Sequence, residues 1–99
     1  MSLESWPFGD QPNVAVIVNR TIVTEHAWIA YVSHDSDDGA WQFYTSQTEP
    51  VSESDAMLVS LRCVVEIDPT VQQLSDLPLG WHAWRDSASA PWTRAKIAS

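Results

Sequence analysis

The sequence predicts a single small α+β domain, built mainly from an antiparallel sheet with one or two short helices. Large side chains recur at every second position in residues 28–33 and 41–43, which is the period of a strand. Between these runs, Asp38-Gly39 is typical of a hairpin turn because both residues tolerate positive φ. Ninety-nine residues suffice for one hydrophobic core but not for two.

The first part of the chain is expected to contain an arm, a strand and the hairpin. Residues 1–13 are interrupted by proline and glycine, so we expect an N-terminal arm without regular structure. The continuous apolar run at 14–18 predicts a strand buried on both faces, and Ile22-Val23 predicts a short return strand. The hairpin then covers residues 31–44.

The second part is expected to form a strand, two short helices and a last strand beside the hairpin, over residues 57–59, 61–66, 69–74 and 81–86. Residues 57–67 are ambiguous between helix and strand because many are β-branched. Asp68-Pro69 ends the first helix, and Asp68 can cap the second. The domain proper therefore covers residues 14–86, and 87–99 form a C-terminal tail that docks through Trp92.

The charge balance is strongly acidic. Thirteen Asp and Glu residues against five Lys and Arg give a net charge of -8. This charge argues against unassisted binding to nucleic acid or to an anionic membrane, since both require a cationic surface. Between Glu25 and Asp76 the carboxylates are opposed by Arg62 alone. Such a surface is either simply solubilising or a docking face for a cationic protein.

The sequence contains no recognisable metal, cofactor or catalytic motif. The run Asp35-Ser36-Asp37-Asp38 lacks the glycine and glutamate spacing of a calcium loop, and the three histidines lack zinc-site spacing. Cys63, the one cysteine, is expected to be a small buried hydrophobe. We therefore expect no cofactor and no enzymatic activity. A ligand-binding or hydrolytic domain is the alternative, and it requires a pocket that holds His34 or His82 beside carboxylates.

The first residues contain neither a basic nor an apolar stretch, so we expect no secretory signal. The apolar run at 14–18 is too short to span a bilayer. These observations predict a cytoplasmic protein.

Several ordered landmarks carry a resemblance to a known family. They are Ala15-Val16-Ile17-Val18, Ile29-Ala30-Tyr31, Asp38-Gly39-x-Trp41-x-Phe43, Glu49, Asp68-Pro69-x-Val71-x-x-Leu74, Leu79-Gly80 and Arg85. With them the chain resembles a small bacterial family of domains of unknown function that is grouped with immunity proteins of polymorphic toxin systems. Ala40 and residues 46–49 depart from the family pattern. The resemblance implies a non-enzymatic protein that protects its producer by binding a cognate toxin.

Charge and resemblance together predict an immunity-type binding protein with a basic toxin as partner, present as a monomer or a weak dimer. Trp81 and Trp84, three apart on a strand, face opposite ways, so one is expected to be exposed as a binding hot spot. The predicted partner-binding residues are Asp35, Asp37, Asp38, Trp41, Glu49, Asp55 and Trp84, with Glu53 as a further acidic candidate. The alternative function is an accessory interaction or regulatory domain without a toxin partner.

Overall fold

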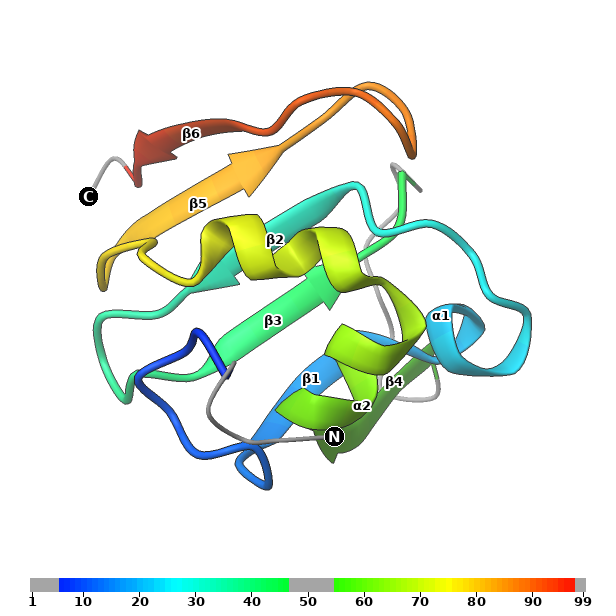
Figure 1. Ribbon diagram of the computed structural model, residues 1–99, viewed down its shortest axis with the longest axis horizontal. Helices are drawn as coiled ribbons and strands as arrows, with labels where there is room; N and C mark the ends of the chain where they lie inside the picture. The colour runs from blue at the N-terminus through cyan, green and yellow to red at the C-terminus, as the bar shows by residue number, and fades with distance from the viewer. Residues whose placement is uncertain (1–5, 47–54, 98–99) are drawn as a thin grey trace.

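The computed structural model describes residues 6–46 and 55–97, in which six strands form one mixed sheet. The strands are β1 (Ala15–Asn19), β2 (Tyr31–His34), β3 (Trp41–Tyr44), β4 (Ala56–Ser60), β5 (Trp81–Trp84) and β6 (Thr93–Lys96). They lie in the order β4-β1-β3-β2-β5-β6 (Figure 1). β1 and β3 pair in parallel, and the other neighbouring pairs are antiparallel. The predicted α+β class with a mainly antiparallel sheet is confirmed.

The predicted hairpin is formed by β2 and β3, with His34 opposite Trp41 at the turn end. Two backbone hydrogen bonds close the turn: the Asp35 N–H donates to the Ala40 carbonyl at 2.8 Å, and the Gly39 N–H donates to the Asp35 carbonyl at 3.0 Å. Gly39 has a φ of 74°, which side chains with a Cβ rarely adopt. The turn therefore depends on a glycine at this position.

Three short helices connect the strands: α1 (Arg20–Thr24), α2 (Leu61–Ile67) and the 3-10 helix η3 (Pro69–Leu74). Both helices predicted after β4 are present. The Ser60 hydroxyl accepts from the Cys63 N–H at 3.1 Å, and the Asp68 carboxylate accepts from the Thr70 N–H at 3.0 Å, so each helix has a side-chain N-cap. Figure 1 shows that α2 and η3 lie over the same face of the sheet.

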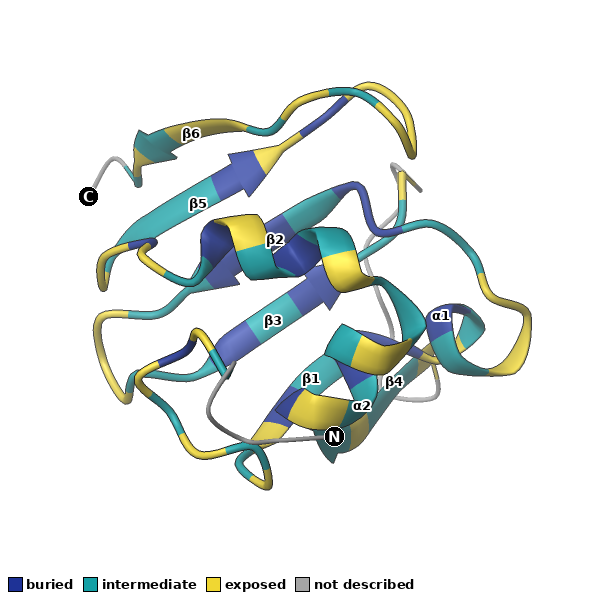
Figure 2. Ribbon diagram, viewed as in Figure 1, coloured by how far each residue is buried: buried dark blue, intermediate teal, exposed yellow. Residues whose placement is uncertain are grey.

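The hydrophobic core lies between that face and the two helices (Figure 2). The fully buried side chains of the two layers include Val16, Val18, Val32, Phe43, Leu61, Val64, Val71 and Leu74. Each such side chain stabilises the fold by about 1.5–3 kcal/mol relative to exposure. From the N-terminal arm, Phe8 packs edge-on against Trp41 with ring centroids 5.4 Å apart, so residues 6–13 are anchored although they have no regular structure.

The prediction of a short return strand at Ile22-Val23 is wrong. These residues belong to α1, and Ile22 is buried in the core from that helix. The Asn19 side chain accepts from the Thr45 N–H at 2.8 Å, which ties the end of β1 to the end of β3. Two β-branched residues are too short a run to specify a strand, and here the packing of one apolar side chain decides the local structure.

The C-terminal residues dock through Trp92, as predicted, but they also contain β6, which was not predicted. Trp92 packs against the core, and the Arg85 guanidinium carbon lies 4.2 Å from the centroid of its ring. β6 then pairs with β5, placing Thr93 opposite Trp84. Its sequence, Thr-Arg-Ala-Lys, has no apolar alternation because both faces of this edge strand are largely exposed.

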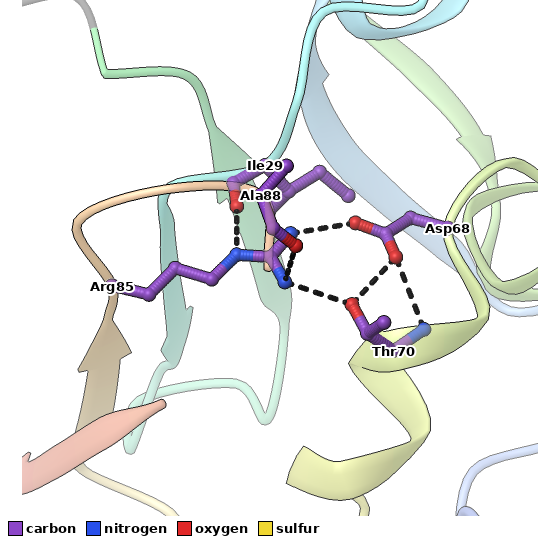
Figure 3. A network of polar contacts seen from close by, with 5 residues as sticks. All are labelled: Ile29, Asp68, Thr70, Arg85 and Ala88. Carbon is purple, nitrogen blue, oxygen red and sulfur yellow. Dashed lines mark hydrogen bonds and ion pairs between the residues drawn. The ribbon is translucent and has the colours of Figure 1, made fainter. Parts of the chain in front are cut away.

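Arg85 directly follows β5 and is buried to 6% exposure. Its Nε donates to the Ile29 carbonyl at 2.8 Å, and its Nη2 forms an ion pair with Asp68 Oδ2 at 2.7 Å (Figure 3). Its Nη1 donates to the Thr70 hydroxyl at 2.9 Å and to the Ala88 carbonyl at 3.1 Å. Arg85 thus ties the segment between β5 and β6 to the start of η3 and to the residues before β2.

Within the described residues, no helix is both long and apolar enough to cross a membrane.

Candidate partner-binding surface

The turn between β2 and β3 carries three of the carboxylates predicted to meet a partner. Asp37 and Asp38 are exposed. The Asp38 carboxylate accepts from the Ala40 N–H at 3.0 Å, which fixes the conformation of the turn. The turn therefore presents negative charge on a defined backbone.

The sheet face turned away from α2 and η3 lies next to this turn and is called the open face below. The alternation of the strands and their register place on it Ile17, Tyr31, Ser33, Gln42, Tyr44, Leu58, His82 and Trp84. Leu58 is 68% exposed and Trp84 is 37% exposed, whereas most of the others are half-buried. The open face thus offers apolar and aromatic surface outside the core.

Four rings form a continuous aromatic strip across three neighbouring strands of the open face. Tyr31 on β2 lies 6.3 Å from Tyr44 on β3 and 5.5 Å from His82 on β5, measured between ring centroids. His82 lies 5.2 Å from Trp84 on the same strand. The Tyr31 hydroxyl and His82 Nδ1 are 2.9 Å apart and form a hydrogen bond. This bond fixes the two central rings relative to each other.

Asp35 connects the acidic turn to the aromatic strip. Its Oδ2 accepts from Gln42 Nε2 at 2.5 Å and its Oδ1 accepts from the Ser33 hydroxyl at 3.3 Å. The Gln42 side-chain carbonyl in turn accepts from the Tyr44 hydroxyl. Burial raises the pKa of both Tyr31 and Tyr44, and the negative charge of Asp35 raises them further. The charge of Asp35 therefore acts on the strip as well as on the turn.

The structure brings Trp84 to the predicted surface but not Trp41. Trp84 is the exposed member of the predicted Trp81 and Trp84 pair, and it lies at the end of the aromatic strip. Trp41 is 2% exposed, stacks on His34 with ring centroids 3.9 Å apart, and donates from Nε1 to the Asp10 carboxylate at 3.1 Å. The Trp41 ring therefore faces the core and does not belong to the exposed surface.

Of the remaining predicted acidic residues, Asp55 is described by the structure, and it does not join the turn. Asp55 precedes β4, whose first residue Ala56 pairs with Asn19 at the end of β1. Since β1 runs parallel to β3, Asp55 lies at the opposite end of the sheet from the turn. Glu49 and Glu53 lie outside the described residues. Asp55 is therefore not part of the acidic surface that the turn forms.

Among residues 6–46 and 55–97, no three His, Cys, Asp or Glu side chains are grouped so as to hold a metal ion. His34 Nδ1 lies 2.8 Å from the Leu77 carbonyl, which can only accept, so this nitrogen carries the proton. A pocket beside η3 is lined by Thr70, Gln73, Arg85 and residues 88–91. This lining contains neither a histidine nor a carboxylate, so it lacks the groups that the hydrolytic alternative requires.

The aromatic strip was not predicted from the sequence, although its signal is present there. Tyr31 and Tyr44 alternate with the core residues Val32 and Phe43, as does Gln42. Period-two alternation shows that these side chains share a face, but only the position of the helices decides which face is covered.

Comparison of the chain with protein-family models, with curated proteins and with solved structures gave no match.

Proposed function

We propose that this protein is a non-enzymatic binding protein that neutralises a cognate cationic toxin in the cytoplasm of the producing cell. Its contact surface consists of the acidic turn and the adjoining aromatic strip. The observation that supports this most strongly is the link between the acidic turn and the aromatic strip, in a chain with a net charge of -8: the Asp35 carboxylate accepts from Gln42, which in turn accepts from the Tyr44 hydroxyl. The toxin as partner rests on the resemblance of the sequence to immunity proteins.

The chemistry of this surface fits arginine and lysine side chains. An arginine can stack its planar guanidinium on the ring of Tyr31 or Tyr44 and still reach the Asp35 carboxylate, because it combines a flat apolar face with a fork of donors. Asp35 is already oriented by Gln42 and Ser33, so little side-chain entropy is lost when it accepts a further donor. Aromatic contact then slows dissociation, while charge speeds association.

Growth protection tests the proposal directly. Cells that express the product of the gene adjacent to this protein's own gene are given either the wild-type protein or the variant Asp35→Asn, Asp37→Asn, Asp38→Asn. Each exposed carboxylate of a complementary interface contributes about 0.5–1 kcal/mol, so the triple variant is expected to bind about 30-fold more weakly and to protect less.

A charge-matched control separates a local contact from the loss of net charge. The variant Glu25→Gln, Asp55→Asn, Glu66→Gln removes the same number of negative charges from exposed positions away from the turn. It should protect like the wild type. Equal protection by all three proteins would remove the turn from the mechanism. A neighbouring gene product without effect on growth would instead favour an accessory interaction domain.

A further inference from the structure

The two outer strands of the sheet differ in how their free edges are protected. β6 carries the exposed residues Arg94 and Lys96. β4 has no charged residue along its length, and Leu58 at its centre is 68% exposed. Charged side chains on an edge strand prevent pairing with another strand, whereas an apolar uncharged edge invites it. At one end of β4, Arg20 Nη2 donates to the Ala56 carbonyl at 3.5 Å. Among the described residues, the uncharged part of this edge around Leu58 is therefore the part of the sheet that is open to a further strand.

The hydrogen-bond pattern shows which backbone groups of β4 point outward. The Leu61 N–H donates to the Val14 carbonyl at 2.9 Å, in continuation of the β1–β4 register. Hydrogen-bonded and non-bonded pairs alternate along an antiparallel ladder, so Val59 and Met57 direct their N–H and C=O groups toward β1. Leu58, between them, directs its N–H and C=O groups to the outside. Ala56 and Ser60, two residues away on either side, do the same.

We propose that β4 pairs antiparallel with β4 of a second copy of this chain, about a two-fold axis at Leu58. In this register Leu58 faces Leu58, and Ala56 faces Ser60, so outward groups meet outward groups along the whole strand. The Leu58 residues exchange two hydrogen bonds, and the Ser60 N–H donates to the Ala56 carbonyl, which has two lone pairs and already accepts from Arg20 Nη2 at 3.5 Å. A slip of one residue would place outward groups opposite inward ones, and a slip of two would leave one outward position unpaired.

Side chains around the edge support this arrangement. Leu58 lies beside Ile17, its partner on β1, so two copies of Leu58 would extend one apolar patch across the axis. Asp55 precedes β4 and Arg62 follows it in α2, so antiparallel pairing would bring Asp55 of one copy and Arg62 of the other to the same end of the interface. Arg62 is exposed and forms an exposed pair with Glu66 at 3.5 Å. The two-fold axis repeats this meeting of opposite charges at both ends of the interface.

The dimer is expected to be weak and to depend on salt. A short strand pair buries less area than a standard interface. Two chains with a net charge of -8 also repel each other, and salt screens that repulsion. Because the axis stands perpendicular to the sheet, both open faces point the same way. The pairing does not rest on the proposed function, since β4 lies away from the acidic turn.

Sedimentation equilibrium of the purified chain tests the proposal, with Leu58→Lys as the test variant. Lysine keeps the strand but adds the kind of charge that protects edges, so the dimer dissociation constant should rise at least about tenfold. Leu79→Lys is the control because Leu79 is a 55% exposed leucine outside the strands. It should dimerise like the wild type. Added salt should strengthen the wild-type dimer.

Hydrogen exchange of backbone amides distinguishes edge pairing from any other contact. The amides of Leu58 and Ser60 should become protected as the wild-type concentration is raised, and they should not do so in Leu58→Lys. A wild-type chain that stays monomeric up to millimolar concentration in high salt would overturn the proposal. So would a dimer that Leu58→Lys leaves intact, or a dimer in which the Leu58 amide exchanges freely.

Discussion

Replacing Arg85 with lysine should destabilise the fold strongly although the charge is kept. A lysine can still pair with Asp68, but its single ammonium cannot also reach the Ile29 carbonyl, which belongs to a fully buried residue. A buried polar group left without a partner costs about 1–3 kcal/mol. Loss of the contact between the guanidinium and the Trp92 ring costs about 1 kcal/mol more. The expected loss in the free energy of unfolding is therefore about 2–4 kcal/mol.

Urea unfolding of the wild type and of Arg85→Lys measures this loss, and Arg94→Lys is the matched control. Arg94 also pairs with a carboxylate, Asp76, at 2.8 Å, but that pair is exposed to solvent and should contribute little. In thermal unfolding the loss at Arg85 corresponds to about 10–25 °C for a chain of this size. A loss below about 1 kcal/mol, or one equal to that of Arg94→Lys, would refute the structural role of the network.

Two further predictions concern the turn and the open face. Gly39→Ala should reduce the free energy of unfolding by about 1–2 kcal/mol because Gly39 has a positive φ. Gly9→Ala is the control and should change the free energy of unfolding little, since the added Cβ meets open space. Equal effects of the two substitutions in chemical denaturation would contradict this prediction. Tyr31 and Tyr44 are the two tyrosines of the chain, so ultraviolet absorbance of tyrosinate should report both titrating above the ordinary pKa of 10.0. Because the raised pKa means that the folded state holds these protons more tightly than the unfolded chain, stability should fall as the pH rises through the folded pKa values. Asp35→Asn should lower both pKa values but leave them above 10.0, since burial is the larger cause; a titration unchanged by this substitution would show that Asp35 does not act on the rings.

Local sequence signals were sufficient for the central part of the fold. The hairpin follows from period-two alternation and from Asp38-Gly39, both of which act within a few residues. The helix over η3 follows from Asp68 as a cap and from proline at the first position. The helix at Ile22-Val23 and the strand β6 were not predicted because both depend on residues far along the chain. Ile22 packs into the core, and β6 pairs with β5.

The candidate surface was predicted only in part for the same reason. The acidic turn is local and could be found, whereas the separation of Asp55 from it depends on the parallel pairing of β1 with β3. Trp41 and Tyr44 are equally aromatic in sequence, and only the position of α2 and η3 sends one into the core and the other to the open face. The burial of Arg85 likewise depends on Asp68, seventeen residues earlier.

The most direct test of the account is to map the bound surface by nuclear magnetic resonance. Amide and side-chain signals of the labelled protein are compared with and without the candidate toxin, the product of the adjacent gene. The account predicts the largest changes at the acidic turn, at the Trp84 indole and at the other rings of the aromatic strip. Changes centred on the exposed residues of α2 and η3, such as Arg62 and Gln73, would place the partner on the opposite face and contradict it.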